Sequence, residues 1–166
     1  MPDLIFISGT INAGKTTVSA LLQEALPQAA HIEVDRLRHF VAWMPLLESI
    51  PITLDNAARV AENFLKNGFH VIFDYPLSYE QFHSLSARLA PLAGRLHAFV
   101  LSPPLHVTTS DRGSRPLSAR ELSRIRAQVE GGLHDPGFGV VLDNGAESPK
   151  ATVTRVLQHL GLKPAA

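Results

Sequence analysis

The sequence contains no cysteine, and it lacks the long apolar segment that a membrane protein needs. Without cysteine the chain can form no disulfide, bind no zinc through thiolates and use no cysteine nucleophile, which is compatible with a reducing compartment. The apolar run near the start is far shorter than the roughly 20 residues of a membrane span, and no basic segment precedes it. We therefore expect a cytoplasmic protein that has no membrane partner.

The chain also lacks net charge, because 15 lysine and arginine residues balance 15 aspartate and glutamate residues. There is no overall positive field to attract nucleic acid and no block of like charge that resembles a polyelectrolyte tail. A nucleic-acid partner is therefore not expected. A length of 166 residues suits one hydrophobic core, and we predict a single domain over residues 1–166.

Five apolar runs of strand length alternate with helical patterns along the chain. The runs cover residues 4–8, 31–34, 70–74, 96–101 and 139–143. Apolar residues at helical spacing predict helices over 18–26 and 57–65, and serine caps predict further helix starts near residues 78, 102, 118 and 148. Strands that alternate with helices indicate a parallel sheet covered by helices, which is an α/β fold.

The segment GTINAGKT, residues 9–16, matches the pattern G-x-x-x-x-G-K-[ST] between a predicted strand and a predicted helix. Two glycines permit a backbone whose amides, from residues 11–16, point at phosphate oxygens beside the positive helix N-terminus. Lys15 would reach the β- and γ-phosphates, and the Thr16 hydroxyl would ligate Mg²⁺ between them. A chance turn is the alternative. We predict a site for ATP and Mg²⁺. The predicted nucleotide-binding residues are Gly9, Thr10, Asn12, Ala13, Gly14, Lys15, Thr16 and Thr17.

Two aspartates each end a predicted strand at the edge of the sheet where ligands bind in open α/β folds. Asp74 follows HVIF and suits a Walker-B carboxylate that supports the magnesium ion, although a helix N-cap or loop role is the alternative. Asp35 follows HIEV and could accept the proton of a substrate hydroxyl that attacks the γ-phosphate. Since a helix start follows Asp35, an N-cap role is its alternative.

Arginines supply a third group of candidate residues. Arg112 and Arg115 lie in a loop-like basic stretch, and we predict that residues 109–118 form a lid whose guanidinium groups stabilise the transition state. Arg36 and Arg38 suit either an anionic substrate or a charged surface. The three arginines of the next predicted helix are interpreted as a solvated face. They are Arg120, Arg124 and Arg126.

In the segments SGTINAGKTT, IEVDRL and VIFDYPL, the chain resembles the small P-loop kinases of the chloramphenicol phosphotransferase type, near shikimate, gluconate and nucleoside monophosphate kinases. The resemblance implies a three-layer P-loop NTPase fold, in which helices cover both faces of a five-stranded parallel sheet of order 2-3-1-4-5. It also implies that Asp35 is the base. Tyr75 stands where those enzymes commonly have a second acidic residue, and residues 37–53 have their own sequence. Chloramphenicol itself is therefore not the expected substrate.

These features together predict a phosphotransferase that uses ATP and Mg²⁺ and acts on the hydroxyl of a small-molecule acceptor, such as an antibiotic or a sugar-like compound. The predicted catalytic residues are Lys15, Asp35, Arg112 and Arg115, and the predicted metal ligands are Thr16 and Asp74. Two alternatives remain. One is a regulatory nucleotide-binding protein with little or no kinase activity, and the other is a nucleoside monophosphate kinase.

Overall fold

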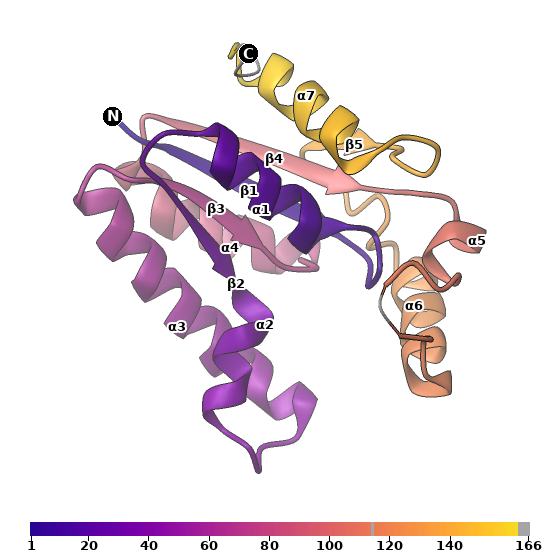
Figure 1. The fold of residues 1–166 in the computed structure, drawn as a ribbon. Coiled ribbons are helices and arrows are strands. Elements are labelled where there is room, and N and C mark those ends of the chain that lie inside the picture. The colour runs from indigo at the N-terminus through magenta and orange to yellow at the C-terminus, as the bar shows by residue number, and fades with distance from the viewer. Residues whose placement is uncertain (114, 163–166) are drawn as a thin grey trace.

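The computed structural model describes residues 1–113 and 115–162. Five strands form one sheet of order β2-β3-β1-β4-β5, and all neighbouring pairs in it are parallel. The strands are β1 (Asp3–Gly9), β2 (Ala29–Glu33), β3 (His70–Asp74), β4 (Arg95–Leu101) and β5 (Val140–Leu142). The α/β class and the strand order implied by the resemblance are confirmed (Figure 1).

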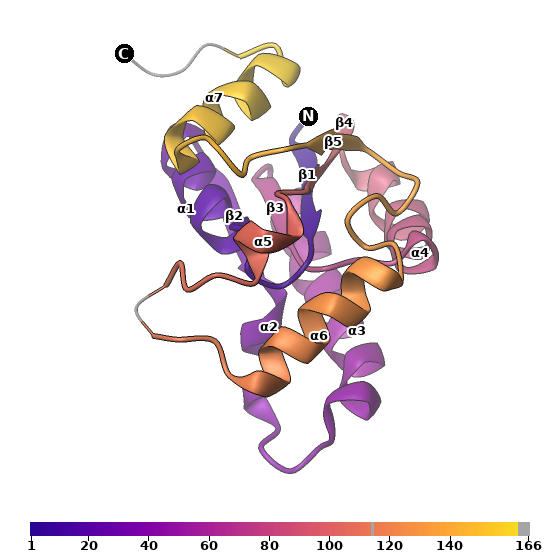
Figure 2. The ribbon, with the colours of Figure 1, turned by 90° about the vertical axis from the view of Figure 1, so that its right-hand side faces the viewer.

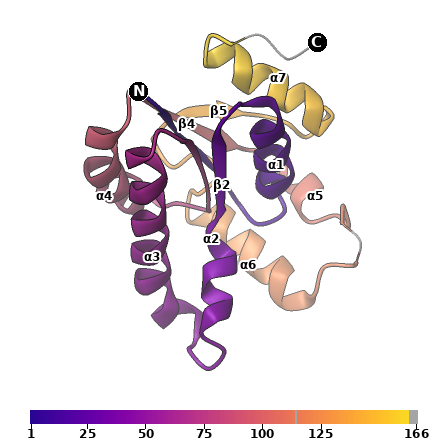
Figure 3. The same cartoon turned by 60° about the vertical axis from the view of Figure 1, so that its left-hand side comes forward.

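Helices follow the strands and form the outer layers of the fold. The longer helices are α1 (Lys15–Ala25), α3 (Leu46–Lys66), α4 (Tyr79–Leu89), α6 (Ala119–Glu130) and α7 (Pro149–His159). The short ones are α2 (Val34–Leu37), η1 (Arg38–Phe40), η2 (Ala90–Leu92) and α5 (Leu105–Thr108). Helices α1 and α7 cover one face of the sheet, and α3 and α4 cover the other (Figure 3). None of the described helices is long and apolar enough to cross a lipid bilayer.

Strand β1 lies at the centre of the sheet and contributes to the cores on both faces. Leu4 and Phe6 pack with α3 and α4, while Ile5 and Ile7 pack with α1 and α7. This division follows from the alternation of side chains along a strand, and it explains why β1 reads as a continuous apolar run. The phosphate loop predicted at residues 9–16 therefore begins from the best-buried strand of the sheet.

Helix α3 begins at Leu46, well before the predicted helix over residues 57–65. Pro51 lies inside it and has no N–H to donate to the Leu47 carbonyl. Leu47 is 78% exposed, so solvent can hydrate the carbonyl that loses its partner. The additional turns of α3 therefore include much of the segment over residues 37–53 that differs from the chloramphenicol phosphotransferases.

The helix predicted to begin at Ser102 is also corrected. The amide of Ser102 donates a hydrogen bond to the Leu142 carbonyl, so this residue, just past the end of β4, still pairs with β5. Pro103 precedes Pro104, and a residue before proline is disfavoured in the helical conformation. Helix α5 consequently begins at Leu105, with Pro104 as its N-cap.

Candidate functional site

The phosphate loop connects the carboxyl end of β1 to the start of α1. Gly9 has φ +136°, and a Cβ there would lie 2.4 Å from the Leu101 carbonyl oxygen at the end of β4. Gly14 has φ +96° and forms the N-cap of α1 without a capping side chain. Both glycines therefore occupy conformations that a side chain would strain. The loop passes close to β4 and leaves the helix N-terminus without a side-chain cap.

The backbone amides of residues 11–16 were expected to face a phosphate, but some of them already donate hydrogen bonds within the protein. The Ile11 amide donates to the Gln128 side-chain oxygen at 2.7 Å, and the Ala13 amide donates to the Thr10 carbonyl at 3.2 Å. The first amides of a helix have no intrahelical acceptor, which applies to residues 15–17 at the start of α1. These groups, together with the helix dipole, provide a site for an anion.

Lys15 is the first residue of α1 and is 9% exposed. Its Nζ donates a hydrogen bond of 2.8 Å to the Thr10 carbonyl. Burial lowers the pKa of the Lys15 ammonium group, and the charges of Asp74 and Asp35 oppose this shift. The structure thus brings the loop lysine and both candidate aspartates into one electrostatic neighbourhood.

Asp74 is the last residue of β3 and is 3% exposed. Its Oδ2 lies 3.3 Å from Nε2 of His31 on the neighbouring edge strand β2. The N-cap alternative for Asp74 is wrong, because Ser78 caps the following helix α4 and accepts a hydrogen bond from the Gln81 amide. The Asp74 side chain instead lies at the carboxyl end of the sheet and contacts His31.

Asp35 lies in the first turn of α2, one residue inside the helix. Glu33 is the N-cap of this helix, so the N-cap alternative for Asp35 is wrong as well. The Asp35 side chain is exposed and has no hydrogen-bond or ion-pair partner among residues 1–113 and 115–162. Asp35 and Lys15 line the same cleft.

This cleft has a volume of about 760 Å³ and borders the phosphate loop. It lies between helix α6 and the α2–α3 arm, which consists of α2, η1 and the first turns of α3 (residues 34–50). Figure 2 shows α6 beside this arm, at the end of the molecule to which the carboxyl ends of β1 and β3 point. Its polar side chains come from elements far apart in the sequence. Those that bear on the chemistry are Lys15, Asp35, Arg38, Tyr75, Arg124 and Gln128.

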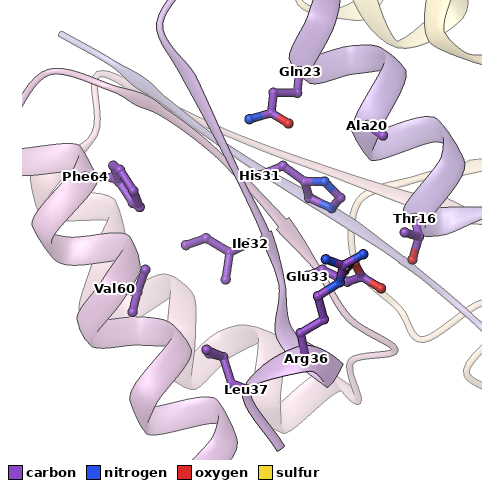
Figure 4. A pocket seen from close by; sticks show the side chains of 10 residues that line it. All are labelled: Thr16, Ala20, Gln23, His31, Ile32, Glu33, Arg36, Leu37, Val60 and Phe64. Atoms are coloured by element: carbon purple, nitrogen blue, oxygen red, sulfur yellow. Dashed lines mark ion pairs between the residues drawn. The ribbon is translucent and has the colours of Figure 1, made fainter. Parts of the chain in front are cut away.

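A separate hollow of about 430 Å³ flanks strand β2 and has Thr16 and His31 on its wall. Figure 4 shows the His31 side chain extending from β2 toward helix α1, which carries Thr16, and Arg36 paired with Glu33. The Arg36 guanidinium therefore already has a carboxylate partner. No group of three or more histidine, aspartate or glutamate side chains in the described part of the chain could hold a metal ion alone.

The donors that were expected to bind Mg²⁺ are the Thr16 hydroxyl, which is exposed, and the buried Asp74 carboxylate. Both are oxygen donors, as Mg²⁺ requires, and this ion commonly takes only one or two carboxylates while phosphates and water complete its shell. Thr16 and Asp74 therefore fit an ion that arrives with a nucleotide. Thr17, the next residue of the loop, is exposed in the first turn of α1.

The predicted lid segment contacts the phosphate loop through two hydrogen-bonded side chains. Arg112 Nη1 donates to the Asn12 carbonyl at 3.1 Å, and Asn12 Nδ2 donates to the carbonyls of Thr108 and Ser110 at 2.8 and 2.9 Å. Of the predicted lid, residues 109–118, Ser114 lies outside the described residues. The structure places Arg112 against the loop.

Arg115 has a different environment from Arg112. It forms two hydrogen bonds to the Glu121 carboxylate, at 3.0 and 2.7 Å, and Glu121 also completes the capping box of α6 with Ser118. The Arg115 side chain lines the cleft, but its charge is compensated by Glu121.

Arg124 corrects the interpretation of the α6 arginines as a solvated face. Its side chain is half-buried and lines the cleft. Gln128, one turn further along α6, accepts the Ile11 amide hydrogen bond. The spacing of four residues places Arg124 and Gln128 on one helix face, but local periodicity does not distinguish a face that borders a cleft from a solvated one.

Asn144 is a further loop contact that the sequence analysis did not identify. It is buried, follows strand β5 and donates from Nδ2 to the Ala13 carbonyl at 3.0 Å. Like Asp35 and Asp74, Asn144 follows an apolar strand at the carboxyl edge of the sheet, and this position is a signal that could have indicated it. The phosphate loop is therefore held from both sides, by Asn144 and by Gln128.

No protein-family model matches the chain, and no curated protein sequence matches it. Solved structures match it over nearly the full length. The tunicamycin resistance protein of Deinococcus radiodurans is 16% identical, with a TM-score of 0.74 over 100% of this chain and 99% of its own. A sugar kinase from Janibacter sp. HTCC2649 is 19% identical, with a TM-score of 0.71 over 99% and 97% of the two chains. The Mycobacterium tuberculosis APS kinase in complex with AMPPNP and APS is 17% identical, with a TM-score of 0.68 over 96% and 98%.

At these low identities the likeness defines the fold. The chain has the three-layer fold of small P-loop kinases, with the strand order that the resemblance implied. Its phosphate loop joins β1 to α1, and two carboxylates lie within electrostatic range of the loop lysine.

Proposed function

We propose that this protein is an ATP-dependent kinase that transfers the γ-phosphoryl group of ATP to the hydroxyl of a small molecule. The observation that carries the proposal is the placement of Lys15 and Asp35 on one cleft, at the uncapped N-terminus of α1. The structural likeness to small P-loop kinases along the whole chain supports the same class.

The residues of the site suit the individual parts of this reaction. The α1 amides and Lys15 would bind the phosphates, and Lys15 would neutralise the charge that develops on the leaving oxygen. Asp35 would accept the hydroxyl proton as the acceptor oxygen bonds to the γ-phosphorus and the bond to the bridging oxygen breaks, which releases ADP. Thr16 and Asp74 would hold Mg²⁺, which when bound neutralises phosphate charge. Arg112 and Arg115 would act from the lid.

A test of this function measures ADP release with and without a panel of aminoglycosides, phenicols, sugars, nucleosides and nucleoside monophosphates. We expect ADP release that depends on the acceptor and falls by about 10²-fold or more in Lys15→Ala. ADP release at the same rate with every compound and with none would contradict the proposal.

A regulatory nucleotide-binding protein is the second candidate, and one contact favours it. Gln128 already occupies the Ile11 amide, which lies in the phosphate loop, so a nucleotide would meet a loop that is partly engaged by α6. Nucleotide binding without acceptor-dependent turnover would support this candidate. Turnover that requires a monophosphate would instead indicate a nucleoside monophosphate kinase.

A further inference from the structure

The cleft carries more positive than negative charge, and two of its arginines have no carboxylate partner among the described residues. Arg115 is neutralised by Glu121, and Lys15 lies within the field of Asp35 and Asp74. Arg38 and Arg124 also line the cleft, yet neither has a carboxylate partner within residues 1–113 and 115–162. Cationic side chains that enclose a cavity without partners indicate an anionic ligand.

The two arginines reach the cleft from different elements of the fold. Arg38 begins η1, directly after α2, whereas Arg124 lies on α6, and Figure 1 shows α2 and α6 on separate sides of the lower half of the molecule. Both positive charges oppose the rise in the Tyr75 pKa that burial causes. Tyr75 lines the same cleft, so its phenol and the two guanidinium groups border one cavity.

Tyr75 adds a neutral hydrogen-bond donor to the cleft. Burial raises the pKa of Tyr75 to about 12, and the Asp35 carboxylate contributes to the same shift. The phenol therefore remains protonated at neutral pH and can donate a hydrogen bond to an oxyanion. The Asp35 carboxylate repels an anion, which favours binding of the charged group at the arginines and leaves the hydroxyl for Asp35.

The remaining wall of the cleft is apolar. Leu46, Leu47 and Ile50 come from the first turns of α3, and Leu47 is 78% exposed. Such a surface gives a polyhydroxylated ligand few hydrogen-bond partners, but it suits an apolar group that would cover Leu47.

We propose that the acceptor is a hydroxyl compound that also carries an anionic group, either a carboxylate or a phosphate monoester, bound by Arg38, Arg124 and Tyr75, with an apolar part against α3. This inference rests on the proposed kinase function, because it assigns the acceptor side of the same cleft. It distinguishes the chain from an enzyme whose acceptor is uncharged.

Binding of small aromatic probes tests the subsite without turnover. A nonhydrolysable ATP analogue with Mg²⁺ first saturates the phosphate loop, and calorimetry then compares phenyl phosphate, benzoate and benzamide. We expect at least one of the two anions to bind about tenfold or more tightly than benzamide, since charged hydrogen bonds are the stronger ones. The better anion identifies phosphate or carboxylate as the favoured group. Equal binding of all three probes would overturn the inference.

Variants locate the anion within the cleft. Arg38→Gln and Arg124→Gln should each weaken binding of the preferred anion by about tenfold and leave benzamide binding within about twofold. Arg126→Gln is the matched control, because Arg126 is exposed on the same helix and does not line the cleft. If both variants bind the anion as the wild type does, or lose only affinity for the ATP analogue, the arginines do not form an acceptor subsite.

Turnover separates this inference from the proposed function. The specificity constant kcat/KM is measured for pairs that differ in charge, namely mandelate and mandelamide, gluconate and gluconamide, and nucleoside monophosphates and nucleosides. A preference for the charged member supports both proposals. Equal turnover of charged and neutral members would refute the anionic subsite while the kinase function stands. Preferential anion binding without any acceptor-dependent ADP release would refute the kinase function and leave an anion site.

Discussion

The parallel sheet has an amino edge, where its strands begin, and a carboxyl edge, where they end. The charged residues near these two edges are paired differently. At the amino edge, Asp3 is 3% exposed and receives two hydrogen bonds from the Arg95 guanidinium group, at 3.0 and 2.8 Å. Beyond the carboxyl edge, Asp35 on α2 and Arg124 on α6 face a cleft, and neither has a partner of opposite charge among the described residues. Ligands of open α/β sheets bind at the carboxyl edge. The comparison indicates that the Asp3–Arg95 pair stabilises the fold, whereas Asp35 and Arg124 remain available to a ligand in the cleft.

Asp35→Asn should have the largest effect on activity of the changes considered. The amide cannot accept a proton at neutral pH, so acceptor phosphorylation should fall by roughly 10²- to 10⁴-fold. Glu33 and not Asp35 caps α2, and the Asp35 side chain is exposed, so the melting temperature should change little when its interactions with the α2 dipole and with Lys15 are lost. Transfer rate, nucleotide affinity and melting temperature are measured on one preparation.

The same experiment can contradict the distinction between the two edges. Transfer that stays within a few-fold of wild type at an unchanged melting temperature would show that Asp35 is not the base. Asp74 would then be tested by Asp74→Asn, whose effect on stability should be larger because this carboxylate is buried beside His31.

Lys15→Ala should reduce transfer by about 10²-fold or more, because a charge that stabilises the transition state is removed. The fold should persist, since removing Lys15 relieves the desolvation of a buried charge, and within the described residues its Nζ donates a hydrogen bond only to the adjacent Thr10 carbonyl. Circular dichroism and steady-state turnover are measured together. Unchanged turnover with an intact spectrum would refute the assignment of Lys15 to the site.

Arg112→Ala and Arg115→Ala should separate the two lid arginines. We expect Arg112→Ala to lower turnover by roughly tenfold and nucleotide affinity less, because a lid engages mainly on closure. Arg115→Ala should have a smaller effect, since Glu121 already compensates this charge. Turnover and nucleotide affinity are compared for both variants. Equal losses of both quantities in Arg112→Ala would indicate ground-state binding of the nucleotide instead.

The features that could be predicted from the sequence are those with a local signature. The phosphate loop is eight consecutive residues, and the strands are short apolar runs bounded by polar residues, so spacing alone indicates both. The start of α3 was not predicted, because Pro51 reads as a helix breaker, whereas the exposed first turns tolerate the lost hydrogen bond. The contribution of α3 to the wall of the cleft beside Lys15 and Asp35 was not predicted for the same reason.

Contacts between residues far apart in the sequence could not be predicted. Gln128 reaches Ile11 across 117 positions, and Arg95 reaches Asp3 across 92. Each pair is brought together by the strand order, which spacing did not determine and only the resemblance implied. The same applies to Arg124, whose position on α6 acquires meaning only when this helix is placed opposite Arg38.

Arg95→Met should have the smallest effect on activity and a measurable effect on stability. The variant keeps an apolar stem but leaves the buried Asp3 carboxylate without its guanidinium partner, which should lower the melting temperature by roughly 5 °C at pH 7. Turnover should stay within about twofold of wild type, because Arg95 lies at the edge of the sheet opposite the cleft. Arg126→Met is the control, since it removes an exposed arginine outside both charge clusters.

The pH dependence of this difference identifies its cause. Burial alone would raise the pKa of Asp3, but the hydrogen bonds and charge of Arg95 outweigh burial and lower it. The folded state therefore binds the Asp3 proton less readily than the unfolded state does, for which the pKa is about 3.9. The stabilisation is complete above this pH and is lost as the pH falls through the lower folded pKa. The melting temperatures of wild type and Arg95→Met should thus converge below about pH 4. A constant difference from pH 7 to pH 3 would show that Arg95 stabilises the amino edge by packing and not by charge.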